Sequence, residues 1–274
     1  MPPRSSSAAA RLALAALGGL AAGCTHLHPE EELRLGADVH AQLSWQLPML
    51  EDELVRSYVS AIGDRIVRAA GPQPFAYRFF VVVSPELNAF AAPAGHVYVH
   101  TGTVLACGDV SELAAVLAHE VGHVAQRHLA ENYERRVAAG RAQRIGSLAA
   151  GLVAGPAGAG ATSLLGGLTS VAVLNSFSRD DEREADAFAV EILSEAGYDP
   201  EGLVSFFRRL VGEGGAGAPA FLSSHPDTEA RVREVSRALA EGPPDAELET
   251  RDGGRLEIIQ RRIRLLTGEV RPSP

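Results

Sequence analysis

The sequence predicts an α+β fold that is mainly α-helical, with a small β-sheet placed directly before one long helix. The composition is 46% hydrophobic but only 5% aromatic, and leucine and alanine dominate it, which suits a helix-rich globular body. Apolar residues recur at helical spacing in several stretches, whereas two short stretches are rich in β-branched and aromatic residues. The balance of 25 basic against 34 acidic residues argues against a general nucleic-acid-binding protein.

The first 23 residues are predicted to be a secretory signal peptide. A positively charged start precedes an apolar stretch over residues 12–22, which is too short for a comfortable membrane span. Small residues then run directly into Cys24, a pattern that resembles the lipobox of bacterial lipoproteins. The resemblance implies that Cys24 is lipidated and that residues 24–29 form a tether; the alternative is a plain signal peptide cut nearby. Because Thr25 follows, and not aspartate, the implied anchor is in the outer membrane of a Gram-negative-type bacterium, facing the periplasm.

The segment before the long helix is predicted to contain helix first and then sheet. Residues 30–70 carry apolar side chains at helical spacing among charges, until a Gly-Pro pair stops the run. Residues 75–83 predict a strand, and Asn88 begins a second extended piece. After a turn over residues 92–95, alternating residues predict another strand over 96–100.

The long helix carries two histidines, His119 and His123, with a glutamate between them. Asp109 is a good N-cap for this helix, and Glu112 stands three residues later, as in a capping box. Residues four apart share one helix face, so both imidazoles can reach a single metal ion. Glu120 points about a quarter-turn away, where it can take a proton from a water on that ion. The alternative is an ordinary amphipathic helix with two satisfied histidines. A chain with two cysteines excludes a Cys-rich structural zinc site.

A catalytic zinc ion usually takes three protein ligands and leaves a position for water, so a third ligand must come from another element. The downstream candidates are Glu182, Glu184, Asp186 and His225. Glu182 and Asp186 are four apart on a predicted helix that opens at residue 178, whereas Glu184 points nearly opposite. We therefore predict that Glu182 binds the metal and that Asp186 accepts the free N–H of a ligating histidine. His128 is expected to point away, as a surface or helix-capping residue.

Two further regions complete the chain. Residues 145–178 contain no charged side chain and are rich in glycine and alanine, which favours a helical hairpin packed on the core or a mobile lid. A membrane span is disfavoured there because Pro156 and many glycines interrupt the stretch. A polar helix is predicted over residues 228–240. Residues 242–274 are predicted to form a C-terminal tail with a short helix.

Together these motifs resemble the gluzincin metallopeptidase family that includes the CAAX prenyl proteases, the bacterial heat-shock membrane protease HtpX and the mitochondrial Oma protease. The resemblance is closest to a soluble periplasmic lipoprotein branch, similar to the β-barrel assembly-enhancing protease, and covers roughly residues 30–240. Two departures are that Ala94 stands where the family often has glycine, and that no repeat domain of that branch is visible. The matching segments are residues 119–123, 182–186, 225–226, 88–95 and 124–128.

The resemblance implies a zincin-like metallopeptidase domain over residues 30–241 that binds one Zn²⁺ per chain. It implies an endopeptidase that acts on misfolded or unassembled envelope proteins. His225 and Arg231 are implied donors to the tetrahedral oxyanion, and His225 could also bind the zinc in a resting state. An edge strand from Asn88 to Ala92 could pair with an extended substrate through backbone hydrogen bonds. The alternative function is a chaperone-like binding module whose zinc site is structural or latent.

Overall fold

The computed structural model describes residues 26–140, 177–212, 221, 225, 228–241 and 248–268. The predictions on the signal peptide, on Cys24 and on nearly all of the uncharged stretch 145–178 therefore lie outside the described residues. The described part is mainly α-helical with one small three-stranded sheet, which confirms the predicted α+β class. No helix within it is both long and apolar enough to pass through a membrane.

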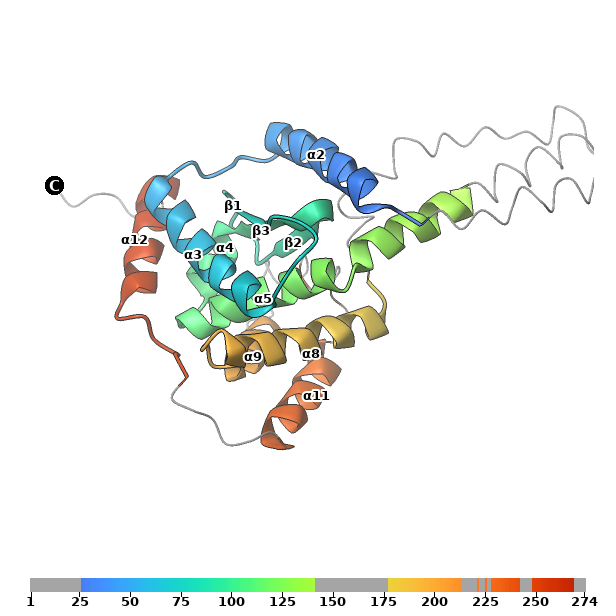
Figure 1. Cartoon of the computed structure of the whole chain (residues 1–274). Helices are drawn as coiled ribbons and strands as arrows, with labels where there is room; N and C mark the ends of the chain where they lie inside the picture. The colour runs from blue at the N-terminus through green and yellow to red at the C-terminus, as the bar shows by residue number, and fades with distance from the viewer. Residues whose placement is uncertain are drawn as a thin grey trace, which may run out of the picture.

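The elements follow one another largely as the sequence predicts (Figure 1). Residues 128–140 form a further helix after the long central one. In chain order the elements are α2 (Pro29–Gln46), α3 (Glu53–Ala69), β1 (Arg78–Val82), β2 (Ala89–Ala92), the short 3-10 helix η1 (Pro93–Gly95), β3 (His96–His100), α4 (Thr101–Ala106), α5 (Val110–Ala125), α8 (Arg179–Glu195), α9 (Glu201–Gly212), α11 (Thr228–Glu241) and α12 (Arg255–Thr267).

The predicted helical region 30–70 consists of two helices, α2 and α3, separated by an extended piece. That piece runs beside β1: the Leu50 N–H donates to the Val81 carbonyl and the Val83 N–H donates to the Pro48 carbonyl, each at 2.8 Å. Pro48 cannot donate within a helix, and hydrogen bonds to a strand thirty residues away replace those of a continuous helix. The side chain of Asp52 then caps α3.

The sheet has the strand order β1-β3-β2, with β1 parallel and β2 antiparallel to β3. Phe80, Tyr98 and Phe90 lie opposite one another across the three strands. Their rings are stacked, with centroid separations of 5.0 Å and 4.8 Å. His40 from α2 covers this aromatic row, with its Nδ1 atom 2.7 Å from the Tyr98 hydroxyl. Strand β2 forms one edge of the sheet.

Helix α5 lies in the middle of the molecule, between the sheet and α3 on one side and α8 and α9 on the other (Figure 1). Every residue from Val110 to Val124 is buried. A Cβ atom added to Gly122 would lie 3.1 Å from the carbonyl oxygen of Ala185, so glycine at this position lets α8 approach closely. This approach places the start of α8 beside the two histidines of α5.

The last helix of the described fold joins the main hydrophobic core, to which α3 and α5 also contribute. Helix α12, predicted as a short helix in a tail, buries Leu256, Ile259 and Ile263 against that core. The side chain of Gln260 donates to the carbonyl oxygens of Val104 and Cys107, at 3.0 Å and 2.8 Å. These bonds satisfy acceptors at the C-terminal end of α4, a place where helices leave carbonyl groups unpaired.

Candidate metal centre

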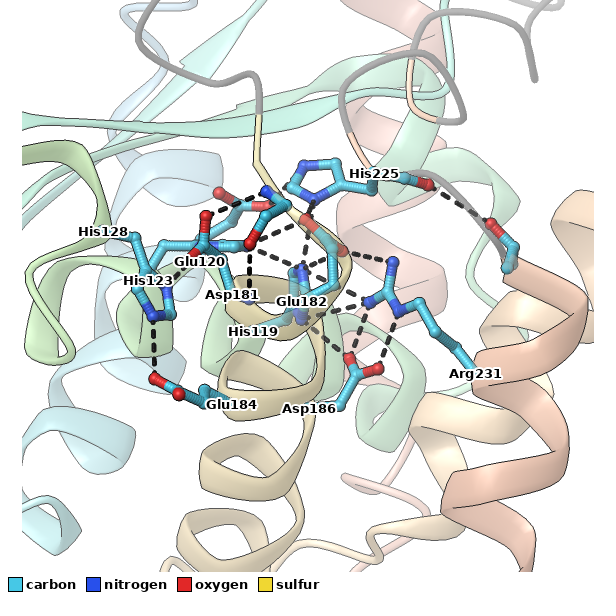
Figure 2. A network of polar contacts seen from close by, with 12 residues as sticks. His119, Glu120, His123, His128, Asp181, Glu182, Glu184, Asp186, His225 and Arg231 are labelled. Carbon is cyan, nitrogen blue, oxygen red and sulfur yellow. Dashed lines mark hydrogen bonds and ion pairs between the residues drawn. The ribbon is translucent and has the colours of Figure 1, made fainter. Parts of the chain in front are cut away.

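Four buried side chains bring one potential metal-ligating atom each to a common point, within 4.8 Å of one another: His119, His123, Glu182 and His225. Figure 2 shows them converging from α5, from α8 and from the segment before α11. The Nε2 atoms of the two α5 histidines are 3.1 Å apart. The carboxylate of Glu182 lies 3.5 Å from one of these nitrogens and 3.4 Å from the other.

The separations between these donors match those around a tetrahedral zinc ion. Zn–N and Zn–O bonds of about 2.0–2.1 Å place neighbouring ligand atoms about 3.3 Å apart. Five of the six donor pairs are 2.9 Å to 3.5 Å apart, and all four donors lie within 4.8 Å of one another. Imidazole lone pairs that face one another in a dry site repel unless a cation or a proton lies between them. The donor set therefore fits a bound divalent cation.

Local sequence features fix the first two donors. The side chain of Asp109 accepts the backbone N–H of Glu112 at 3.0 Å, which confirms the predicted N-cap of α5. The side chain of Glu112 does not return to Asp109 as a capping box requires; it accepts the Gly108 N–H and pairs with Arg209. The helix that follows is regular, so residues 119 and 123 present their rings on the same face.

The third donor comes from the first turn of α8. Ser178 caps this helix and forms a capping box with Asp181, so the acidic segment begins the helix as predicted. The next residue, Glu182, is buried against α5, and Asp186 lies one turn further on the same face. The structure thus brings the predicted carboxylate to both imidazoles.

His225 is the fourth donor, at the place where the sequence suggested a position for water. Its Nδ1 atom lies 2.9 Å from Glu182 Oε1 and 3.2 Å from His119 Nε2. Its ring packs against that of Phe221, with centroids 4.4 Å apart. In this structure a metal ion would have four protein ligands, which is the arrangement of closed sites.

Glu120 is buried beside the donors but is not one of them. Its Oε1 atom lies 3.5 Å from Nε2 of His225, and neither carboxylate oxygen has a hydrogen-bond partner among the described residues. Burial raises the pKa of this carboxyl group above its ordinary value. A carboxylate with a raised pKa is a stronger proton acceptor, which suits a general base.

Asp186 and Arg231 stand behind the ligands. The Oδ1 atom of Asp186 lies 3.0 Å from Nδ1 of His119, on the side of the ring that faces away from the donors. Arg231 binds Asp186 with two hydrogen bonds, of 2.7 Å and 2.6 Å, and approaches Glu182 Oε2 to 2.5 Å. Burial opposes ionisation of Asp186, but the bonds from Arg231 hold its pKa below the ordinary value. The guanidinium is thus committed to carboxylates, and the oxyanion role of Arg231 stays a prediction.

One expectation at this site is wrong. His128 does not point away: it is buried, with its Nδ1 atom 3.0 Å from Nδ1 of His123. The reason is a break after α5, where Arg127 adopts a left-handed φ of 62° and turns the chain back toward the site. No pattern in the sequence marks an arginine for that conformation.

Phe177 is a second residue that the sequence did not single out. Its ring stacks on that of His123, with centroids 3.6 Å apart and an interplanar angle of 15°. It is the last residue but one of the uncharged stretch 145–178. Near its end the stretch therefore places an aromatic ring on one of the candidate metal-ligating imidazoles.

Asn88 directly precedes the edge strand β2, and Ala92 is the last residue of that strand. The Asn88 N–H donates to Thr103 Oγ1 at 2.7 Å, and the Asn88 carbonyl accepts the His100 N–H at 3.0 Å. These groups of Asn88 are therefore used within the protein. Ala94, in the turn that follows, has a left-handed φ of 62°, which explains why glycine would suit that position. The substrate-binding role of Asn88 and Ala92 stays a prediction.

Two histidines four apart on a buried helix, a glutamate between them and a carboxylate from a second helix define the HExxH class of metalloenzyme site. Residues 53–239 match Peptidase family M48, and the chain therefore belongs to that family. The resemblance inferred from the motifs is confirmed, and so is the predicted enzyme class, a metalloendopeptidase.

Several curated proteins are similar to this chain. The beta-barrel assembly-enhancing protease of Escherichia coli is 31% identical over 221 residues, which cover 79% of this chain and 45% of the relative. The mitochondrial metalloendopeptidase OMA1 of Schizosaccharomyces pombe is 35% identical over 193 residues, covering 67% of this chain and 53% of the relative. Metalloprotease YcaL of Escherichia coli is 31% identical over 162 residues, or 59% and 62% of the two chains. The chain thus spans about half the length of the first two relatives.

Proposed function

We propose that this protein is a zinc-dependent endopeptidase that hydrolyses peptide bonds of misfolded or unassembled envelope proteins. The observation that carries the chemistry is the convergence of His119, His123 and Glu182, with Glu120 buried beside them. The name of the E. coli relative, a beta-barrel assembly-enhancing protease, supports a role in the envelope. The family match supports the reaction.

His119, His123 and Glu182 would hold the zinc. When bound, zinc would act as a Lewis acid that lowers the pKa of water to about 7 and polarises a carbonyl group. Glu120 accepts the proton of the attacking water and later returns it to the leaving amine. Asp186 accepts the Nδ1–H of His119 and so orients that ring. Arg231 holds Asp186 and Glu182 in place.

His225 is proposed to have two positions. In the position seen here its Nδ1 atom completes the donor set, which would leave no place for water or substrate. His225 itself belongs to no described helix or strand, so displacing its ring would not require α5 or α8 to unfold. Once displaced, it would be available to donate a hydrogen bond to the tetrahedral oxyanion.

The same observation supports the second candidate function, a chaperone-like binding module with a latent zinc site. A metal held by four protein ligands is typical of structural sites. The proposed substrate contact is the same in both cases: an extended chain added to the edge strand β2 by backbone hydrogen bonds. The two functions differ in whether Glu120 acts.

We further propose that the protein is anchored to the periplasmic side of the outer membrane by a lipid on Cys24. The support is the small-residue run into this cysteine, after an apolar stretch of signal-peptide length. Cys24 lies two residues before the first described residue, His26, so the catalytic domain would sit close to the membrane surface.

The experiment that separates the two functions is Glu120→Gln, with Glu195→Gln on the exposed end of α8 as the control. Zinc content is measured, together with casein cleavage in the presence and absence of a chelator. We expect one zinc per chain in all three proteins and chelator-sensitive cleavage in the wild type and the control. Cleavage by Glu120→Gln should fall by about 10²–10⁴-fold, because a general base contributes that much.

A full cellular effect of the Glu120→Gln variant without cleavage would favour the binding module, whereas full cleavage by this variant would overturn the assignment of Glu120 as the general base. A wild-type chain that holds no zinc would overturn the metal assignment itself.

A further inference from the structure

The ring of His123 is held from behind by another histidine. Its Nε2 atom faces the metal donors, 3.1 Å from the corresponding atom of His119. Its Nδ1 atom, on the opposite side of the ring, lies 3.0 Å from Nδ1 of His128. The Nε2 atom of His128 in turn lies 3.3 Å from a carboxylate oxygen of Glu184. Figure 2 shows this series of side chains leading away from the metal centre, on the side opposite Arg231.

A left-handed turn after α5 brings His128 next to His123. On a straight helix, side chains five residues apart point about 140° away from each other, so His128 could not reach His123. Helix α5 ends first, and Arg127 turns the chain with a φ of 62°. The Arg127 guanidinium is fixed at 3.1 Å from Glu32 and donates to the Leu27 carbonyl at 2.9 Å. Two contacts from the N-terminal part of the chain thus stabilise the turn.

Only one arrangement of ring hydrogens satisfies these contacts together. To bind a metal, Nε2 of His123 must present a lone pair, which puts its hydrogen on Nδ1. That hydrogen can only be donated to a lone pair on Nδ1 of His128. The hydrogen of a neutral His128 is then on Nε2, where the carboxylate of Glu184 accepts it. Each contact determines the next.

The two α5 imidazoles therefore have similar support. His119 donates directly to Asp186, whereas His123 reaches Glu184 through His128. Both carboxylates belong to α8, the helix that also supplies the ligand Glu182. The side chain of Asp186 is 5% exposed and that of Glu184 is 65% exposed, so water weakens the outer contact of the longer series.

We propose that His128 is a positioning residue for the metal ligand His123. By accepting the Nδ1–H of His123, it fixes the tautomer and the ring orientation in which Nε2 is free to bind the metal. Glu184 fixes the tautomer of His128 in the same way. The inference rests on the zinc site of the proposed function. It assigns a role to two residues that bind neither metal nor substrate.

The test compares His128→Leu, which removes both nitrogens, with His128→Asn. The Oδ1 atom of asparagine can stand near the place of Nδ1 and accept the same hydrogen bond. His100→Leu is the matched control, because it removes a buried imidazole from β3, outside the donor set. For each full-length protein we would measure the zinc dissociation constant by chelator competition, the visible spectrum with Co²⁺, and the unfolding temperature without metal.

We expect His128→Leu to weaken zinc binding by about 10–100-fold, the usual effect of losing a partner of a metal-ligating histidine. Its Co²⁺ spectrum should change as well. His128→Asn should lie closer to the wild type than to His128→Leu in both measurements. Glu184→Gln should have a smaller effect than His128→Leu. His100→Leu should leave zinc affinity and the Co²⁺ spectrum unchanged.

Wild-type zinc affinity and an unchanged Co²⁺ spectrum in His128→Leu would overturn the inference while leaving the proposed function intact. Equal weakening by His128→Leu and His128→Asn, with equal losses of metal-free unfolding temperature, would also overturn it, because packing alone would then explain the effect. A wild-type chain that binds no zinc would defeat the proposed function itself.

Discussion

The metal centre and the seam between α3 and α12 are both held by arginine–carboxylate pairs, but in very different surroundings. At the metal centre, the side chains of Arg231 and Asp186 are 3% and 5% exposed. At the seam, those of Arg262 and Asp52 are 46% and 13% exposed, with a similar distance of 2.7 Å. Geometry alone therefore does not measure how much such a pair contributes to stability, because water screens the exposed pair.

The pair between Arg209 of α9 and Glu112 of α5 is intermediate, with side chains 33% and 4% exposed. Three pairs of the same chemistry therefore form a series of decreasing burial. Removing the arginine or the carboxylate from each tests whether the free energy of unfolding follows that series. Measurements in the presence of a chelator keep zinc binding out of the comparison.

The largest loss is expected for Arg231→Met. This change keeps a side chain that can pack on the Phe207 ring, over which the guanidinium lies at 4.3 Å, but it leaves two buried carboxylates without their cation. Breaking a buried pair by removing one partner costs about 3–5 kcal/mol. Urea denaturation of the metal-free protein measures the loss.

Arg231→Lys is the control for this prediction. It retains the positive charge but cannot form the two-pronged contact with Asp186, so it should recover part of the lost stability and not all of it. Added zinc should reduce the difference between Arg231→Met and the wild type, because a divalent cation would itself compensate Glu182. Wild-type stability of the metal-free Arg231→Met protein would show that burial does not decide how much these pairs contribute.

An intermediate loss is expected for Arg209→Met. Glu112 would keep the hydrogen bond from the Gly108 N–H, at 2.7 Å, but lose two bonds from the guanidinium. Hydrogen bonds to charged groups contribute about 1.5–3 kcal/mol, and partial exposure of the arginine reduces that figure. The same urea titration gives the result, with Arg209→Lys as the control. A loss as large as that of Arg231→Met would show that burial is not the deciding factor.

The sequence predicts those features of the metal centre that depend on residues close together in the chain, namely helix caps and the spacing of side chains on one helix face. A capped, regular helix places His119 and His123 on one face, and a second capped helix places Glu182 and Asp186 on one face. The alternating residues of 96–100 likewise predict β3. The spacing of residues says nothing about the distance between α5 and α8. That distance depends on close packing, to which Gly122 contributes.

What could not be predicted depends on contacts between distant segments. The break between α2 and α3 arises because Leu50 bonds to Val81 of β1 and Pro48 bonds to Val83, directly after that strand. The return of His128 toward the site depends on the left-handed turn at Arg127, which Glu32 and Leu27 hold in place. The presence of His225 among the donors depends on its contacts with His119 and Glu182, which are 106 and 43 residues away along the chain. None of these contacts leaves a period or a spacing in the sequence.

The smallest loss is expected for Asp52→Asn, and its pH dependence identifies the cause. Asparagine caps a helix as well as aspartate does, so the variant should keep the N-cap of α3 while losing the charge that faces Arg262. The bond from Arg262 holds the pKa of Asp52 below its ordinary value of 3.8. A carboxyl group whose pKa is lowered by folding contributes stability above its unfolded pKa, and that contribution disappears as the pH falls below it.

Wild type and Asp52→Asn should therefore differ slightly at pH 7 and low salt, and converge in urea titrations below about pH 4 or at high salt. If the two free energies of unfolding differ by the same amount at pH 7 and in acid, the side chain acts through the helix cap and not through the ion pair. The Arg262–Asp52 pair could then no longer be compared with the two more deeply buried pairs.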